Sequence, residues 1–551
     1  MNKKTILILP VLIALSIAVG IVVGNLLTRN SQPALGGMYA GTSNKISTIL
    51  HLIDEGYVDS INTNNIVEKT IPEILKNLDP HSTYIPAKNM VEVKEEMTGN
   101  FSGIGVQFSV MEDTVRVIDV ISGGPSSKVG VMPGDRIVRV NDSIIAGVNV
   151  KNETVLSLLK GKKNTKVQIG IVRKGYDGEL EFEIVRGDIP LYSVDVAYMI
   201  DEVTGFIKID RFANTTYNEF MEGMEKLDAK GAKKVIIDLR GNTGGSLVSV
   251  LQMLDEFLEK GELILYTEGV NQPKKTYSAS GKNTWKDKEV YVMIDEFSAS
   301  ASEIFAGAMQ DNDRGIVVGR RSFGKGLVQE QIPLMDGSAL RLTVARFYTP
   351  SGRCIQSSYE DGNDEYFEHI HERFENMEQL VADSMYFNDS LKYETKGGRI
   401  VYGGGGIMPD FFVPVDTAGN SDYYTAIFRR GLIYTYAYSY ADENRDALNK
   451  LNSADEFDKL LDEKNALGEF IEYAEEKGVS RDEKGLEESG TYINTMLKAY
   501  IARNIIGEEG FYPIIKKIDK TLLKTIEISQ KNLLVQNVNA GNKTEAVPPL
   551  K

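Results

Sequence analysis

Residues 190–350 alternate short apolar runs with amphipathic segments, and this alternation predicts a layered α/β core. Apolar runs bounded by turn residues fit buried strands, and apolar residues spaced three or four apart fit helices that pack on one side. The predicted strands are 204–209, 235–239, 263–266, 289–295, 315–319 and 338–349, and the predicted helices are 216–227, 247–259 and 301–310. Strands that alternate with helices indicate a sheet covered by helices.

Two regions with other patterns precede this core. Residues 43–55 and 64–78 have helical apolar spacing, which predicts a helical N-terminal region over residues 40–97. From residue 98 to residue 187 the pattern changes to short alternating strands. These predicted strands are 114–121, 135–140, 166–172 and 180–185.

The chain becomes more polar after the core. Residues 356–395 form a polar, acidic insertion, and residues 396–418 return to the core. Residues 420–535 are charged and amphipathic, which predicts a helical C-terminal extension whose tyrosine-rich start packs inside it. Residues 536–551 are predicted to be a disordered tail.

The first 30 residues have the composition of a membrane-targeting segment. Lys3 and Lys4 precede residues 5–27, which carry no charge and are long enough to span a bilayer. A cleaved signal peptide is the alternative, but no clear cleavage site precedes Arg29, so an uncleaved anchor is favoured. With the two lysines cytoplasmic, we expect a single-pass protein of the cytoplasmic (inner) membrane with its catalytic part on the periplasmic, extracytoplasmic side.

Composition excludes several classes of partner and cofactor. The net charge of −16 and the lack of a basic block disfavour nucleic acid binding. Cys354 is the only cysteine, which excludes an intrachain disulfide. His369 and His371 have no further clustered ligands, so we expect an exposed polar strand there and no metal site.

Ser300 and Lys325 have the placement expected of a nucleophile and its base. Ser300 lies between the strand 289–295 and the helix 301–310, where free N–H groups and the helix dipole favour a developing oxyanion. The chain has 4 histidines, none between residues 82 and 368, whereas Lys325 stands between two glycines that let the backbone approach a site closely. The residues therefore predict a Ser/Lys hydrolase site, and Lys325 must lose its charge by burial or by nearby cations.

Residues 319–326 also fit the G-x-x-x-x-G-K pattern of a phosphate-binding loop. Gly326, however, occupies the position where such a loop needs a Ser or Thr to hold magnesium. The acidic strand that ends at Asp295 also precedes the loop instead of following it. Nucleotide hydrolysis is therefore disfavoured, and we expect no cofactor.

Four blocks in this order resemble the carboxy-terminal processing peptidases, or tail-specific proteases, of the S41 class. The blocks are DLRGNTGG at 238–245, SASASE at 298–303, SFGKGLVQ at 322–329 and GGGIMPD at 404–410. The resemblance implies that Ser300 is the nucleophile, Lys325 the general base and Gln329 the group that orients the lysine. It also implies that the turn at Gly244 and Gly245 and the amide of Ala301 bind the oxyanion, in a core with the layered fold of Clp proteases and crotonases.

Residues 98–187 resemble a PDZ domain. The matching runs are GIGV at 103–106, GPSSKVG at 124–130 and MPGDRIV at 132–138. The resemblance implies that Gly103, Ile104, Gly105 and Val106 form the loop that binds a C-terminal carboxylate while the peptide adds a strand to the sheet. It also implies that the helical N-terminal region serves dimerisation or substrate gating.

The sequence as a whole predicts a multidomain α+β protein. Its expected parts are a protease core at 188–355 and 396–418, an inserted PDZ domain, an N-terminal helical region and a C-terminal helical extension. The expected function is a serine endopeptidase that recognises the C-terminal tails of unfolded or immature proteins and cleaves them for processing or quality control. Expected partners are such tails, the membrane and a second copy of the chain. The alternative is a non-catalytic PDZ adaptor that binds protein C-termini.

Overall fold

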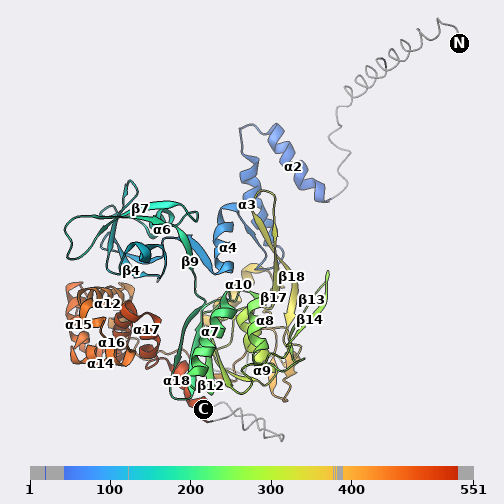
Figure 1. Ribbon diagram of the computed structural model, residues 1–551. Helices are drawn as coiled ribbons and strands as arrows, with labels where there is room; N and C mark the ends of the chain where they lie inside the picture. Colours follow the sequence, from blue (N-terminus) through green and yellow to red (C-terminus); the bar gives the residue numbers. More distant parts are fainter. Residues whose placement is uncertain are drawn as a thin grey trace, which may run out of the picture. The chain divides into compact units, whose positions relative to one another are not determined.

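The computed structural model describes residue 19 and residues 42–121, 123–375, 378, 380 and 389–531. The chain divides into two units, Met1–Ile74 and Leu75–Lys551. The first unit contains α2 (Thr42–Gly56) and nearly all of α3 (Thr63–Leu75), where the sequence predicted helices (Figure 1). Helix α3 ends earlier than predicted, at Leu75, before the Asp79-Pro80 pair.

The prediction of a single-pass inner-membrane protein is wrong on the structure. Within the described ranges, the chain forms no helix whose length and apolar character would suit a bilayer crossing. The segment 5–27, on which that prediction depended, lies outside the described residues except for Val19. The tail 536–551, predicted to be disordered, also lies outside them.

A six-stranded sheet forms the core of the second unit (Figure 1). Its order is β10 (Val194–Met199), β11 (Thr204–Ile209), β12 (Lys234–Asp238), β15 (Glu289–Ile294), β16 (Gly315–Gly319) and β21 (Phe411–Phe412). The strands from β11 to β21 are parallel, and β10 is antiparallel to β11. Strands β11, β15 and β16 are buried almost throughout, because both faces of the sheet are covered.

Alternate residues of these strands belong to two different hydrophobic clusters. One face packs against α7 (Thr216–Ala229), α8 (Leu247–Asp255) and α9 (Ala301–Asp311). The opposite face packs against α18 (Lys520–Gln530), which contributes Leu522 and Ile528. We call these the α9 face and the α18 face. Strand side chains point alternately to the two faces, so the parallel strands need apolar residues at every position.

A second sheet carries the strand that follows the lysine motif. Strand β18 (Ala339–Tyr348) pairs with β17 (Leu327–Pro333) along one edge. Along its other edge it pairs with β1 (Thr83–Ile85) and β13 (Leu263–Gly269), and β13 pairs in turn with β14 (Gln272–Ser278). The sequence did not predict β1, β14 or β17, because these segments are short or mostly polar.

The β-rich region is an insertion whose two ends are paired. Helix α4 (Met90–Thr98) leads into β2 (Asn100–Gly103), and β2 pairs antiparallel with β9 (Gly187–Pro190), where the chain leaves the region. Between them lie α5 (Pro125–Val129), α6 (Asn152–Leu159) and a six-stranded antiparallel sheet. The strands of this sheet are β3 (Val106–Met111), β4 (Thr114–Val120), β5 (Arg136–Val140), β6 (Ser143–Ile144), β7 (Lys166–Val172) and β8 (Leu180–Val185).

The C-terminal extension is helical and has its own hydrophobic core, as predicted. Its helices are α11 (Asp422–Arg429), α12 (Leu432–Glu443), α13 (Arg445–Leu448), α14 (Ala454–Glu463), α15 (Ala466–Glu476), α16 (Glu483–Ile506), α17 (Glu508–Ile515) and α18. Tyr423 packs inside this cluster, and Tyr424, Tyr436 and Tyr440 pack against it, as expected. Tyr434 and Tyr438 instead pack with Met111 and Ile118 of the β-rich region. The fold class predicted from the sequence, a multidomain α+β protein, is confirmed.

The polar insertion contains α10 (Asn363–Glu375), followed by a short hairpin of β19 (Lys392–Glu394) and β20 (Ile400–Tyr402). His369 and His371 lie on α10, so the prediction of a strand at these residues is wrong. The helix begins with Asp364 and Glu365, and acidic residues in a first turn are favourable to the helix dipole.

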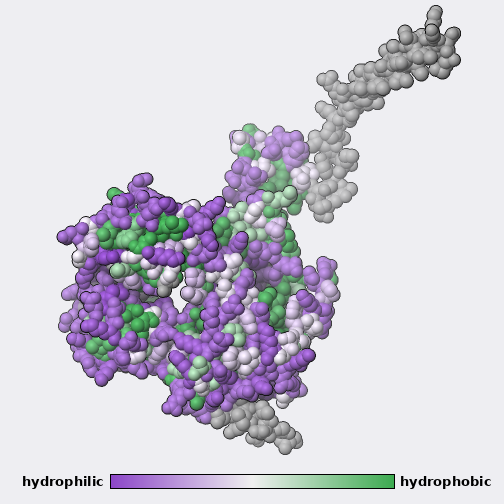
Figure 2. Space-filling view, viewed as in Figure 1, coloured by the Kyte–Doolittle hydropathy of each residue, from purple (hydrophilic) through white to green (hydrophobic). Residues whose placement is uncertain are grey.

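Figure 2 shows that hydrophilic residues cover most of the face in view, with hydrophobic residues in small separate groups. In the first unit, helix α2 carries a row of exposed apolar residues. Ile46, Ile49 and Leu52 are about half exposed and lie at helical spacing. An exposed apolar stripe of this kind is common at interaction surfaces. The predicted homodimer stays a prediction, which this stripe supports.

Candidate functional site

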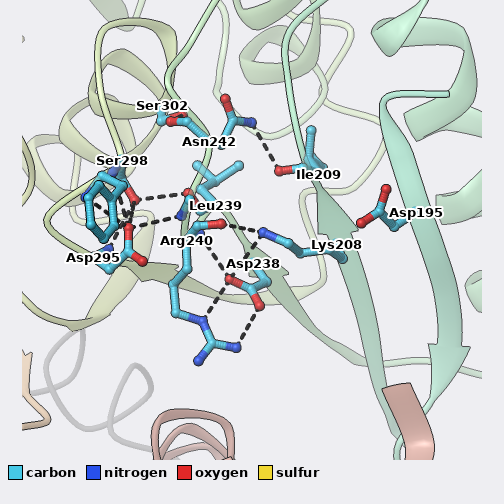
Figure 3. A network of polar contacts seen from close by, with 12 residues as sticks. Asp195, Lys208, Ile209, Asp238, Leu239, Arg240, Asn242, Asp295, Ser298 and Ser302 are labelled. Carbon is cyan, nitrogen blue, oxygen red and sulfur yellow. Dashed lines mark hydrogen bonds and ion pairs between the residues drawn. The ribbon is translucent and has the colours of Figure 1, made fainter. Parts of the chain in front are cut away.

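Ser300 lies at the tight turn between β15 and α9, as the sequence predicted. Its backbone has φ 55° and ψ −110°, a conformation that residues other than glycine rarely adopt. Ser298, two residues before Ser300, ties this turn to the neighbouring strand end, because its hydroxyl donates to the carbonyl of Leu239 at 2.9 Å (Figure 3). The turn is thus held against the loop that follows β12.

The loop 240–245 approaches Ser300 so closely that residue 244 must be glycine. A Cβ on Gly244, whose φ is +100°, would lie 2.7 Å from the Ala299 carbonyl oxygen, 2.8 Å from the Ser300 Cβ and 2.9 Å from the Ala301 nitrogen. A Cβ on Gly245, whose φ is +137°, would lie even closer to its neighbour, 2.0 Å from the Phe212 carbonyl oxygen. Both glycines are therefore needed for the close approach of the backbone.

The amides of this loop are not equivalent. The Gly244 N–H donates to the Asn242 Oδ1 at 2.9 Å, so it is already used inside the loop. The N–H groups of Gly245 and Ala301 have no acceptor among the described residues. Two of the three amides predicted to bind an oxyanion are therefore available, and the Gly244 amide is not.

Glu303 joins the serine turn to the lysine loop. Its buried carboxylate accepts the Ser300 N–H at 2.8 Å and the Lys325 N–H at 2.9 Å. It also accepts the Gly324 N–H at 2.7 Å and the Ser322 hydroxyl at 2.6 Å. Burial raises the pKa of Glu303, although these four hydrogen bonds oppose the rise. The amides that a phosphate-binding loop would offer to a nucleotide are thus occupied by a carboxylate.

Lys325 is partly buried beside Gln329 on β17. The Lys325 Nζ donates to the Gln329 Oε1 at 3.2 Å, and the Gln329 Nε2 donates to the backbone carbonyl of His81. Burial, followed by the charge of Arg341, lowers the pKa of Lys325, while Glu303 and Asp79 oppose the shift. The site therefore favours the neutral amine relative to a lysine in water.

The segment from Asp79 to Ser82, far away in the sequence, packs beside this lysine. Asp79 accepts the His81 N–H and the Ser82 N–H, each at 2.9 Å, and the Thr343 hydroxyl at 3.0 Å. The His81 ring lies against Tyr366 and Phe323, and burial followed by the nearby Lys325 charge lowers its pKa to about 4. The His81 ring is therefore neutral wherever the protein is near neutral pH.

The residues predicted to be catalytic line one cavity of about 680 Å³. Ser300, Ala301, Gly244, Gly245, Lys325 and Gln329 all line it. Beside them lie the apolar side chains of Phe212, Leu247, Ile304, Leu327 and Phe347, and the charged side chains of Glu96, Asp210, Arg211 and Arg341. The cavity combines a serine hydroxyl, a lysine amine, free amides and an apolar wall, which are the kinds of group that acyl transfer uses.

The fourth sequence motif supports the site from outside the cavity. The Ser322 N–H donates to the Ile407 carbonyl at 3.0 Å, and the Ile407 N–H donates to the Ser322 hydroxyl at 2.6 Å. Arg373 of α10 donates to the carbonyls of Ser322 and Phe323. The polar insertion and the residues 404–410 thus fix the backbone of the lysine loop.

The PDZ loop lies apart from this cavity. Gly103 ends β2, Ile104 and Gly105 make the turn, and Val106 begins β3. The Ile104 carbonyl accepts the Ser126 N–H at 2.9 Å, and Gly105 has φ +76°. The binding role predicted for this loop stays a prediction.

Sequence reasoning missed three supporting residues: His81, Arg373 and Asp519. His81 and Arg373 contact the site from distant segments, and Asp519 contacts Arg240. Only the Asp-Pro pair before His81 gave a local signal, and that signal was taken as the end of a helix. Glu303 both caps the first turn of α9 and accepts the Lys325 N–H from the lysine loop.

Three family models match parts of this chain. The model of peptidase family S41 matches residues 203–362, that of the PDZ domain residues 102–184, and that of a family of unknown function residues 423–507. A solved structure described as the PDZ domain of a carboxy-terminal protease from Vibrio cholerae in complex with peptide is 28% identical. The match covers 17% of this chain and 99% of that chain, and its TM-score of 0.16 is too low to support a conclusion.

Two relatives are matched by this chain over most of their own length. The carboxy-terminal processing protease CtpA of Bacillus subtilis (strain 168) is 34% identical over 334 residues, or 60% of this chain and 70% of that protein. The carboxy-terminal-processing protease of Bartonella bacilliformis is 33% identical over 316 residues, or 57% of this chain and 72% of that protein. The chain therefore belongs to the carboxy-terminal processing proteases of peptidase family S41 and is a serine-type endopeptidase.

Proposed function

We propose that this protease cleaves peptide bonds in the C-terminal tails of unfolded or immature proteins, with Ser300 as nucleophile and Lys325 as base. The observation that carries the proposal is the double contact of Glu303. One buried carboxylate binds the backbone of both residues, in a cavity that both residues line. A nucleophile and a base held by one rigid group meet the need for fixed relative geometry in catalysis.

The reaction would begin when the neutral Lys325 Nζ takes the proton of the Ser300 hydroxyl. The Ser300 Oγ then attacks the carbonyl carbon of the scissile bond, and the oxyanion accepts the N–H groups of Gly245 and Ala301. Collapse of this intermediate breaks the C–N bond, and the Lys325 ammonium returns the proton to the leaving amine. A water molecule, deprotonated by Lys325, releases the acyl group in the same way.

Gln329 would keep the lysine in place during these steps. Its Oε1 accepts from Lys325, and its Nε2 is fixed on the His81 carbonyl, so the amide cannot turn without losing a hydrogen bond. Gly244 would act through its missing side chain, which lets the loop lie against Ser300. We assign the oxyanion to Gly245 and Ala301 alone.

Substrate capture would fall to the PDZ domain. Backbone amides of the loop at 103–106 would hold the terminal carboxylate, and the peptide would add a strand to the sheet, as in other PDZ domains. The apolar wall of the cavity, formed in part by Phe212, Leu247 and Ile304, would accept an apolar side chain next to the cleaved bond.

The test is turnover of an unfolded, casein-like protein by the chain from residue 42 onward. We expect Ser300→Ala and Lys325→Ala each to lower kcat by about 10³-fold or more, because each removes a group that acts in the transition state. Ser278→Ala and Lys274→Ala on β14, away from the cavity, are the matched controls and should keep wild-type turnover. Wild-type rates in the two cavity variants would show that the chemistry is assigned to the wrong residues.

A further inference from the structure

Arg240 belongs to the loop that reaches Ser300, yet its guanidinium points away from the cavity. It donates to both oxygens of Asp238, at 3.0 Å from Nε and 2.7 Å from Nη2 (Figure 3). It also donates to both oxygens of Asp519, at 2.9 Å from Nη1 and 2.6 Å from Nη2. The guanidinium is therefore shared between two carboxylates, each bound through two hydrogen bonds, which is the geometry that fixes an arginine best.

The Arg240 backbone transmits this arrangement to the loop. Its N–H donates to Asp238 at 3.0 Å, and its carbonyl accepts from the Lys208 ammonium. The next residue, Gly241, donates its N–H to Asp295 at 2.9 Å. Figure 3 shows these groups converging on the end of β12. From there only a few residues remain to Gly244 and Gly245, so the side chain of Arg240 sets the start of the turn.

Asp519 reaches Arg240 from the far end of the chain. It is the N-cap of α18, where its Oδ1 accepts the Leu522 N–H at 3.0 Å. Helix α18 is in turn held by the core, because Leu522 and Ile528 are buried against Ile236, Tyr291 and Met293 of the sheet. The Asp519 carboxylate therefore has a fixed position relative to the strands that carry the site.

The three charged groups are shielded enough for the contact to matter. The side chains of Asp238, Asp519 and Arg240 are 2%, 15% and 22% exposed. Burial raises the pKa of Asp238 on its own, but Arg240 and Lys208 hold it below its usual value, so this carboxyl is charged at neutral pH. Removal of one partner from such a shielded set leaves the remaining charges poorly compensated.

We propose that Asp519 is a positioning residue for the active site, so that α18 holds the oxyanion loop through Arg240. The inference rests on the function proposed above, because it gives the loop 240–245 its importance. Residues 519–530 lie outside the region matched by the S41 model and outside the region matched by the family of unknown function. The end of the C-terminal extension then affects catalysis by holding the loop 240–245 in position.

The test is Asp519→Asn in the otherwise unchanged chain. Asparagine caps a helix about as well as aspartate, so α18 keeps its first turn while Arg240 loses one charge partner. We expect kcat to fall about 10-fold to 100-fold with KM within about twofold, because a small shift of the loop misplaces the oxyanion donors. We also expect hydrogen exchange of the amides in residues 239–246, measured by mass spectrometry, to become about 10-fold faster.

The matched control is Asp458→Asn on α14, which removes a carboxylate bonded to Lys498 and Lys517 within the same extension. It should leave kcat and the exchange of residues 239–246 at wild-type values. Asp519→Glu, which keeps the charge, should restore part of the lost kcat. Loss of stability alone would slow both Asn variants alike.

The two proposals fail in different ways. An inactive wild type, or an active Ser300→Ala variant, overturns the proposed function, while the exchange measurement still decides the role of Asp519. Wild-type kcat and wild-type exchange in Asp519→Asn overturn the positioning role. A lower kcat without faster exchange in residues 239–246 overturns it as well, and so does an equal effect in Asp458→Asn.

Discussion

The two faces of the central sheet are equally well buried but differ in how they bear on the site. The α9 face is covered by helices that follow the strands in the chain, and the turn into α9 itself carries Ser300. The α18 face is covered by a helix from the end of the described chain, and this helix contacts the loop 240–245 through the ion pair of Asp519 with Arg240. On the function proposed above, the site geometry depends on short connections on the α9 face, and we propose that it also depends on the contact between Asp519 and Arg240 from the α18 face.

The largest effect should come from the α9 face, through Gly244→Ala. The new Cβ would lie within 3 Å of Ala299, Ser300 and Ala301, so the loop must move away from the nucleophile. We expect kcat to fall by about 10²-fold to 10³-fold, as when an oxyanion donor is lost. The measurement is steady-state cleavage of an unfolded protein.

Gly231→Ala is the control for this substitution. Gly231 has φ +91°, close to the +100° of Gly244, but a Cβ there meets nothing within 4 Å. Both alanines should lower the free energy of unfolding by about 1 kcal/mol for the left-handed backbone. If Gly231→Ala lost as much activity as Gly244→Ala, backbone strain and not the close approach to Ser300 would explain the loss.

The next-largest effect should come from the α18 face and should appear as a lower free energy of unfolding. Leu522→Ala removes a side chain that is 2% exposed against the sheet, so we expect the free energy of unfolding to fall by about 2–5 kcal/mol. The folded enzyme should keep most of its kcat, because Asp519 stays at the helix start. Leu523, 43% exposed on the same helix, is the matched control, and Leu523→Ala should be close to neutral in denaturant unfolding. A large loss of kcat in fully folded Leu522→Ala would break the distinction between the two faces.

The smallest effect is a shift in pH dependence. Burial and the charge of Arg341 lower the pKa of Lys325, and only the neutral amine can act as base, so kcat/KM should rise with pH through that lowered pKa. Arg341→Gln removes a positive charge, which raises the pKa of Lys325 and moves the rising limb to higher pH. His81 cannot produce this limb, because its pKa of about 4 leaves it neutral over the whole range.

Gln331→Leu, an uncharged change in the same cavity, should leave the position of the limb unchanged. Profiles of kcat/KM for the wild type and both variants decide the matter. A limb that stays in place in Arg341→Gln would argue against electrostatic control of the base by this arginine.

The sequence predicted most of what local patterns can encode. Buried strands such as β15 and β16 are continuous apolar runs, and the scarcity of histidine singled out Lys325 as the base to test. The turn at Ser300 was placed because an apolar strand changes there to good helix formers. These patterns lie within short stretches of sequence, so they can be recognised without knowledge of the tertiary structure.

Contacts between distant segments could not be predicted in this way. The His81 carbonyl meets Gln329 across 248 positions, and Asp519 meets Arg240 across 279 positions. The sequence pattern of neither segment indicates which residue it contacts. The inward turn of the Gly244 amide toward Asn242 also escaped prediction, because the direction of a loop N–H depends on backbone angles that three adjacent polar or glycine residues leave open.

The pairing of β2 with β9 has a consequence for how such an enzyme changes during evolution. The ladder runs from Asn100 opposite Pro190 to Gly103 opposite Gly187, so the chain enters and leaves the PDZ domain one strand spacing apart, about 4.8 Å. A gene segment coding for the module can then be replaced by another that begins and ends at the same distance. New preferences for protein tails can arise by such an exchange while the peptidase machinery is inherited intact.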